Sequence, residues 1–275
     1  MPAPGWPSTE AELRQLQQAL AREAASLAGS ARWSPEVRIR VGGCFVAYAQ
    51  PRYGPGGAGD PGWAAAVVWT PPRPGSTGAA PSRRGDQALR GATGTPRRAL
   101  DLDDQVVVAG YAAGAYVGGL LALRSGPILA EVVCRLRVLP DVLLVDGTGV
   151  DHPRRAGLAV HLGAVTKLPT VGVTHRPLLA HGGFPPSVRG AKSPLLLDGD
   201  LVGYWVCTRQ GARPVAVHAG WRTDAETAVD VVLSASTNAA RTPVPLQEAR
   251  RVAREARAAG LGDSDEDRTA GSRGR

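Results

Sequence analysis

Residues 141–174 read DVLLVDGTGVDHPRRAGLAVHLGAVTKLPTVGVT, and this stretch decides the fold. It begins with the apolar run DVLLVD and ends with a second apolar run, TVGVT. Both runs are short, rich in valine and bounded by turn residues, which is typical of strands buried on both faces. Residues 155–165 between them have helical character, so the stretch predicts a strand–helix–strand unit with two parallel strands.

The segments on either side add antiparallel strands to this unit. Residues 37–48 and 63–69 are β-type runs, and the connection between them is rich in glycine and proline, which favours a hairpin with a long loop. Further strands are expected at 103–111, 201–208 and 214–219, and helices at 9–28, 118–137, 223–234 and 246–259. A hairpin followed by a parallel unit predicts an α/β fold with a mixed sheet.

The helix at 9–28 has a clear start signal and one apolar face. Thr9 and Glu12 have the spacing of a capping box, in which each side chain accepts a hydrogen bond from the backbone of the other residue. Four leucines follow along one stripe: Leu13, Leu16, Leu20 and Leu27. We therefore expect this helix to pack on the rest of the domain.

Length and composition limit the class of protein. The 275 residues are 43% hydrophobic and 20% charged, a composition typical of globular proteins. We expect a single domain over residues 8–260 and a monomeric protein. No apolar run approaches the roughly 20 residues of a membrane span, and the first residues lack the pattern of a secretion signal, so a cytoplasmic protein without a membrane partner is expected. The polar tail at 261–275 is predicted to be disordered.

The basic charge is concentrated in one segment. The 32 Lys and Arg residues outnumber the 24 Asp and Glu residues by +8, which favours polyanionic partners such as nucleic acid. Residues 70–100 carry six arginines, are rich in glycine and proline and lack apolar periodicity, which predicts a flexible Arg/Gly/Pro-rich insertion.

The chemistry is expected after the strand at 141–146. Asp146 ends that strand, and in open α/β sheets such a position faces the crevice where ligands bind. Gly147 and Gly149 follow and allow close approach of a flat ligand, and His152 lies near the start of the next helix. The alternative is structural: Asp146 would cap the following turn and His152 would be an ordinary polar residue.

Residues 140–178 resemble the core of the endonuclease V family, through the pattern VDG-x-G-x-x-HPR followed by a helix and PT-x-GV. The resemblance implies an RNase H-like mixed sheet flanked by helices. It also implies a Mg²⁺-dependent nuclease that cleaves near deaminated bases such as hypoxanthine. The partners expected from it are single-stranded or deaminated DNA or RNA, with inosine as the base recognised.

Most of the family's catalytic positions are substituted in this chain. Asp146 matches the metal-binding aspartate of the central strand, so it is the expected catalytic residue and metal ligand. The other four positions hold non-matching residues. Phe45 stands for an aspartate, Ser125 for a glutamate, His175 for a lysine and Trp221 for a histidine. We therefore expect a weak or absent Mg²⁺ site, because Mg²⁺ requires hard oxygen ligands.

The features of base recognition are better preserved. The segment AYVGG at 115–119 resembles the wedge that the family inserts into the strand, although both flanking prolines are missing. Tyr116 would stack against a base, or would be a half-buried aromatic at a strand end. The residues expected to bind nucleic acid are Tyr116, Gly119, Gly147, Gly149, His152 and Arg154.

Three functions remain open. The first is an active endonuclease V with a rearranged site, which would need other acids to replace the missing metal ligands. The acids near the motifs are Glu131, Asp151, Asp224 and Glu226. Each of them also fits a capping or surface role. The second is an impaired or inactive relative that still binds inosine-containing or single-stranded nucleic acid, and the pattern of retained and lost residues favours it. The third is a protein-interaction module.

Overall fold

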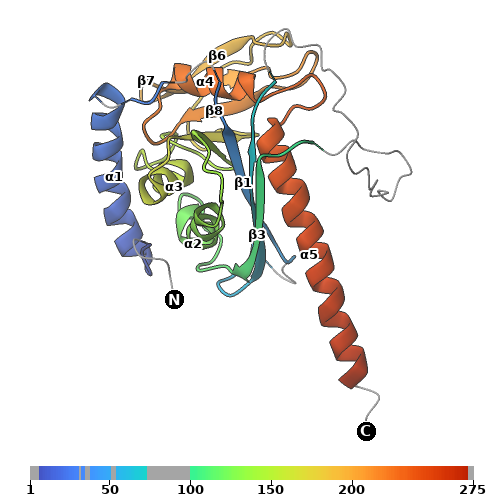
Figure 1. Ribbon diagram of the computed structural model, residues 1–275. Coiled ribbons are helices and arrows are strands. Elements are labelled where there is room, and N and C mark those ends of the chain that lie inside the picture. The colour runs from blue at the N-terminus through green and yellow to red at the C-terminus, as the bar shows by residue number, and fades with distance from the viewer. Residues whose placement is uncertain (1–5, 31, 35–37, 51–53, 73–99, 272–275) are drawn as a thin grey trace.

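The computed structural model describes residues 6–30, 32–34, 38–50, 54–72 and 100–271 (Figure 1). Most of the basic insertion predicted at 70–100 lies outside these ranges. The described strands are β1 (Val41–Tyr48), β2 (Pro61–Trp69), β3 (Asp104–Tyr111), β4 (Val142–Val145), β5 (Thr170–Thr174), β6 (Lys192–Leu197), β7 (Asp200–Val206) and β8 (Val215–Ala219). The described helices are α1 (Glu10–Ser30), α2 (Leu121–Cys134), α3 (Leu158–Thr166), α4 (Ala225–Ser234) and α5 (Val244–Gly271).

The strands form one mixed sheet in the order β3-β2-β1-β4-β5-β8-β7-β6. β1 and β2 pair antiparallel, with Val41 opposite Trp69, and β3 adds antiparallel to β2. β4 lies parallel to both β1 and β5, so the parallel unit predicted from residues 141–174 is confirmed, as is the mixed sheet. In this topology β1, β4 and β5 run in the same direction, so their carboxyl ends lie together along one side of the sheet, at the ends of the central strands.

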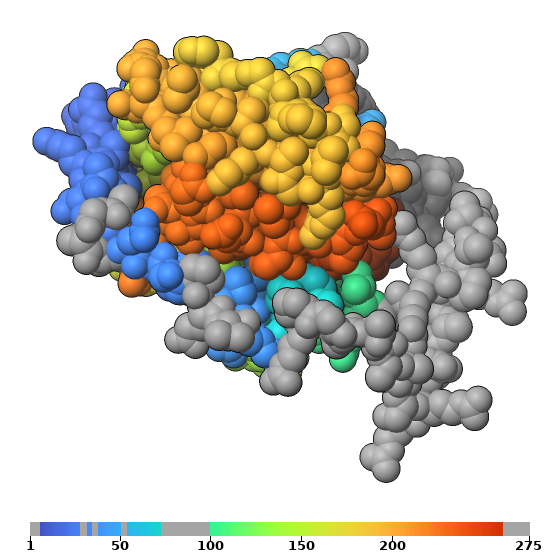
Figure 2. Space-filling view, turned by 90° about the horizontal axis from the view of Figure 1, so that it is seen from above, coloured from blue at the N-terminus to red at the C-terminus, as the bar shows by residue number. Residues whose placement is uncertain are grey.

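Helices cover both faces of the sheet. Successive side chains of a strand point to opposite faces, and β4 shows both environments. Its Leu143 and Val145 pack with α2 and α3, whereas Val142 and Leu144 pack with α4 and α5. In Figure 1, α2 and α3 lie on one side of the central strands and α5 lies along the other. Figure 2 shows the end of the molecule covered by the yellow-to-orange segment that includes β6 and β7.

The start of α5 approaches β1 closely. A Cβ atom on Gly43 would lie 2.4 Å from the carbonyl carbon of Pro245, so a side chain there would displace the helix. Because this glycine lets the first turn of α5 rest on the strand, the side chains of the next turns reach the edge of the sheet where β4 ends.

The helix α1 confirms its predicted start and apolar face. The Glu12 amide donates to Thr9 Oγ1 at 3.2 Å, and the Thr9 amide donates to the Glu12 carboxylate at 3.2 Å. Leu13 and Leu20 are buried, and α1 packs against α3. The core also extends before residue 8, because the Trp6 ring is buried and stacks on His161 with centroids 4.8 Å apart.

Four elements differ from the prediction. α2 begins at Leu121 rather than 118, because Gly119 has a φ of +74° and turns the chain before the helix. α3 begins at Leu158 rather than at the predicted residue 155. The strand β6 was not predicted; Pro194 lies inside it, and the fold tolerates this because β6 is at the end of the sheet. α5 continues to Gly271, past the expected boundary at 260, since each residue added to an established helix forms a further hydrogen bond.

None of the described helices is long and apolar enough to cross a membrane.

Candidate nucleic-acid site

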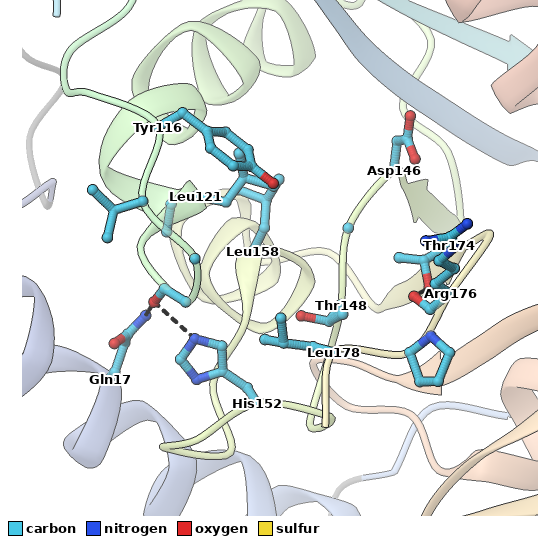
Figure 3. A pocket seen from close by; sticks show the side chains of 16 residues that line it. Gln17, Tyr116, Leu121, Asp146, Thr148, His152, Leu158, Thr174, Arg176 and Leu178 are labelled. Atoms are coloured by element: carbon cyan, nitrogen blue, oxygen red, sulfur yellow. Dashed lines mark hydrogen bonds between the residues drawn. The ribbon is translucent and has the colours of Figure 1, made fainter. Parts of the chain in front are cut away.

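A pocket of about 210 Å³ opens where β4 and β5 end (Figure 3). Its lining comes from α1, from the loop before α2 and the start of α2, from the end of β5, from the segments after β4 and β5 and from α3. The residues are Gln17, Tyr116, Val117, Gly118, Gly119, Leu121, Ala122, Asp146, Gly147, Thr148, His152, Leu158, Thr174, Arg176, Pro177 and Leu178. Of the six residues predicted to bind nucleic acid, four therefore share one pocket.

Tyr116 projects from the loop before α2 over the pocket (Figure 3). Its side chain is 51% exposed, so a large aromatic face is available to a ligand. The Tyr116 amide donates to the carbonyl of Gly56 at 3.0 Å, which ties this loop to the connection between β1 and β2. The side chain is therefore exposed while its backbone is held.

A buried arginine fastens the same two loops together. Arg124 donates to the carbonyl oxygens of Gly57 at 2.7 Å and Gly114 at 3.0 Å, and to Asp60 at 2.8 Å. Its guanidinium also stacks on Tyr48 at 4.2 Å from the ring centroid. The ion pair lowers the pKa of Asp60. This role was not predicted from the sequence; the signal that could have suggested it is an arginine in the largely apolar first part of α2.

The carbonyl oxygen of Gly119 is held from three sides. It accepts hydrogen bonds from His152 Nε2 at 2.9 Å, Arg154 Nη2 at 3.1 Å and Gln17 Nε2 at 3.4 Å. The Arg154 amide donates to His152 Nδ1 at 3.2 Å, which assigns the ring proton to Nε2. Burial lowers the pKa of His152, so the ring is neutral near pH 7. His152 lines the pocket, whereas Arg154 lies outside the lining and positions the loop.

The two glycines after β4 have different environments. Gly147 lines the pocket, and a Cβ atom added there would lie 3.1 Å from the side chain of Leu158. Gly149 lies outside the lining, and a Cβ atom there would be 1.7 Å from the carbonyl oxygen of Ala219. The close approach of the chain to β8 therefore explains Gly149 without a ligand.

Asp146 forms a two-point ion pair with Arg250 of α5. Arg250 Nη2 lies 2.9 Å from one carboxylate oxygen and Nε lies 3.2 Å from the other. The side chains are 14% exposed for Arg250 and 23% for Asp146. Arg250 Nη1 also donates to His175 Nε2 and to Thr242 Oγ1, each at 3.2 Å. Arg250 was not predicted as a site residue from the sequence.

Of the five positions expected from the resemblance to correspond to catalytic residues, the structure brings three together and places the other two elsewhere. Phe45, Asp146 and His175 all surround Arg250, whose guanidinium lies 5.8 Å from the Phe45 ring centroid. Ser125 is buried on α2, where Tyr48 donates to its hydroxyl at 3.2 Å. Trp221 is buried in a cluster with residues of α1 and α3.

The acids considered as replacements have structural partners. Asp151 is fully buried and accepts from the amides of residues 178, 179 and 180 at 2.6 to 3.0 Å. Asp224 caps α4 through the Thr227 amide at 2.7 Å. Glu226 pairs with Lys192, and Glu131 pairs with Arg135. Asp151 therefore anchors the loop at 178–180, Asp224 caps a helix, and Glu226 and Glu131 form surface ion pairs.

The residues around Asp146 do not fit Mg²⁺. Both carboxylate oxygens already accept from Arg250, and a divalent cation bound there would lie beside a guanidinium charge. Within the described ranges, no group of three or more His, Cys, Asp and Glu side chains is arranged to hold a metal. Mg²⁺ requires oxygen ligands in near-octahedral geometry, which Phe45 and His175 do not supply.

Comparisons with known proteins agree with this fold. A family model described as Endonuclease V matches residues 86–251. Endonuclease V of Streptomyces avermitilis is 36% identical over 221 residues, which is 80% of each chain. The crystal structure of Endonuclease V from that organism has a TM-score of 0.73 at 32% identity, covering 94% of this chain and 97% of that chain.

A more distant structure carries a ligand. Endonuclease V of Ciona intestinalis, in complex with a 24mer DNA containing an inosine followed by a ribo-adenosine, has a TM-score of 0.62 at 19% identity and covers 89% of this chain and 96% of that chain. At this identity the likeness concerns the fold. The mixed sheet with flanking helices is RNase H-like, and the chain belongs to the endonuclease V family.

Proposed function

We propose that the protein binds inosine-containing single-stranded nucleic acid in the pocket beside Asp146 and is impaired in metal-dependent cleavage, or lacks it. One observation carries the proposal: the exposed Tyr116 and the strand-end Asp146 share a pocket, while Arg250 holds both oxygens of Asp146. The endonuclease V family typically depends on Mg²⁺. In this protein the exposed ring of Tyr116 is accessible to a base, whereas the carboxylate of Asp146 is paired with the guanidinium of Arg250.

The size and lining of the pocket support a base as the ligand. At about 210 Å³ it is smaller than the roughly 300–1,000 Å³ typical of sites for drug-sized ligands, which suits a single flipped base. Leu121 and Leu158 give it apolar walls, and Tyr116 offers a stacking face. The inosine-containing DNA bound by the Ciona intestinalis protein is consistent with this ligand class.

The test pairs binding with cleavage on the same strands. Labelled single-stranded DNA and RNA with one inosine, and matched strands with guanine instead, are incubated with the protein in Mg²⁺, Mn²⁺ or EDTA. We expect preferential binding of the inosine strand in all three conditions, with no or very little cutting. Efficient Mg²⁺- or Mn²⁺-dependent cutting that Asp146→Ala abolishes would establish an active endonuclease V instead. Neither binding nor cutting would favour a protein-interaction module.

A further inference from the structure

The space next to Asp146 holds an excess of positive charge. Arg250 pairs with Asp146, and Arg254 of the same helix lies 5.7 Å from the Phe45 ring centroid. Burial and the nearby guanidiniums of Arg241 and Arg250 lower the pKa of His175. His175 Nε2 accepts from Arg250, so its ring is neutral. Arg250 thus pairs with Asp146, while Arg254 lies at the neighbouring Phe45 ring and Arg241 acts on His175, a local excess of guanidiniums that favours an anionic ligand.

Arg241 carries a buried donor that no described residue uses. Its Nη2 donates to the carbonyl of Pro214, but its Nε is buried and has no hydrogen-bond partner among the described residues. A buried donor without a partner is unfavourable, because it has lost its hydrogen bonds to water and gained none. Burial and the charges of Arg213 and Arg250 lower the pKa of Arg241, so the neighbouring guanidiniums repel one another. An anion would relieve the repulsion.

Arg250 also retains capacity for a ligand. A guanidinium has five N–H donors. Two go to Asp146, one goes to His175 and one goes to Thr242, which leaves one donor on Nη2. Asp146 lines the pocket together with Arg176, so an anion at this place would adjoin a base held under Tyr116.

We propose that Arg250 stands in place of a divalent cation: its guanidinium neutralises Asp146 and, with Arg241, binds a phosphodiester of the strand whose base occupies the pocket. This inference rests on the proposed function and adds to it the protein group that contacts the phosphate backbone of the nucleic acid. It makes binding independent of metal, and it gives Asp146 a role opposite to that of a metal ligand, since its negative charge now opposes the phosphate.

The experiment measures affinity by fluorescence anisotropy with a labelled inosine-containing single strand, over a range of salt concentrations, in EDTA and in Mg²⁺. The variants are Arg250→Gln, Arg241→Gln and Asp146→Asn. Arg137→Gln is the matched control, because the side chain of Arg137 is 88% exposed. Arg137 lies just after the end of α2, whereas the pocket is at the start of that helix. Melting curves check that each variant folds.

We expect the wild-type affinity to be the same in EDTA and in Mg²⁺. Arg250→Gln and Arg241→Gln should each weaken binding about tenfold and reduce the salt slope by about 1, equally for inosine and guanine strands, because a phosphate contact carries no base information. Asp146→Asn should bind more tightly or unchanged. Arg137→Gln should stay within about twofold of the wild type.

The inference is overturned if Arg250→Gln binds with wild-type affinity and salt slope, if EDTA abolishes wild-type binding, or if Asp146→Asn weakens binding. Should Arg250→Gln not fold, Arg241→Gln and Asp146→Asn decide the matter. The proposed function fails separately, if the wild type shows no preference for inosine over guanine whatever the arginine variants do.

Discussion

Asp146 at the end of β4 and Arg250 in α5 form a two-point ion pair in which each carboxylate oxygen accepts one N–H, at 2.9 and 3.2 Å. The two residues are 104 positions apart in the chain. The pair joins the central strand to the C-terminal helix, and a guanidinium of the protein's own occupies both oxygens of the strand-end carboxylate.

The pair should contribute measurably to stability. In a double-mutant cycle with Asp146→Asn and Arg250→Gln, we expect a coupling free energy of about 1–3 kcal/mol, because both groups are largely buried and the geometry is bidentate. The control is the exposed pair Arg251–Glu255 in the same helix, at 2.7 Å, for which about 0.5 kcal/mol or less is expected. Equal couplings in urea denaturation would contradict this assignment.

Mg²⁺ should leave the melting temperature of the wild type unchanged. Phe45→Asp combined with Arg250→Gln places two carboxylates where the guanidinium now lies, and these repel each other without a cation. We expect this double variant to be stabilised by millimolar Mg²⁺, by about 2.7 kcal/mol if the cation reaches 100 times its dissociation constant. Phe45→Asp alone should respond less, because Arg250 then pairs with both acids.

Each variant is compared with itself in EDTA, since removing Phe45 also removes its packing against Val252 and Ala253. A wild-type protein that Mg²⁺ stabilises, with the effect lost in Asp146→Asn, would show that the present site binds the cation.

Tyr116→Ala should weaken binding of an inosine strand by about 1–3 kcal/mol, the usual worth of a base stacked on an aromatic ring. The melting temperature should hardly change, because the ring is half exposed. Tyr111→Ala is the control, since Tyr111 is 71% exposed at the end of β3 and lies outside the pocket lining. A loss of affinity as large in Tyr111→Ala would indicate a different binding face.

Two buried histidines should make stability depend on pH. Burial lowers the pKa of His161 and of His218 to about 4 in each case. The unfolded chain therefore binds more protons between pH 6.5 and 4. The contribution of each residue is fully present above pH 6.5 and is lost as the pH falls, by roughly 1 kcal/mol for each pH unit.

His161→Phe keeps a ring against Trp6 and removes the titration, so its free energy of unfolding should fall less steeply with decreasing pH than that of the wild type. His181→Gln, at an exposed position, is the control and should keep the wild-type slope. Urea denaturation at several pH values measures both. An unchanged slope in His161→Phe would refute the assignment.

The sequence by itself determined the central strands of the sheet and part of the pocket lining. The valine-rich runs at 141–146 and 170–174 specified parallel strands because a strand buried on both faces has no polar side, and the capping box fixed the start of α1 within one residue. The sequence also identified Tyr116, Gly119, Gly147 and His152 as candidate site residues. The fold brings them into one pocket because their loops lie together at the ends of the central strands.

The tertiary structure decided the partners of those residues. Arg250 and Arg241 resemble any surface arginine in the sequence, because a guanidinium's role depends on what lies within about 3 Å of it, and the neighbours come from segments far apart in the chain. Likewise Gly149 and Arg154, predicted for a ligand, contact β8 and the Gly119 loop. Local patterns encode strands and turns, whereas the charge balance of the site depends on how α5 packs against β1, which no local pattern records.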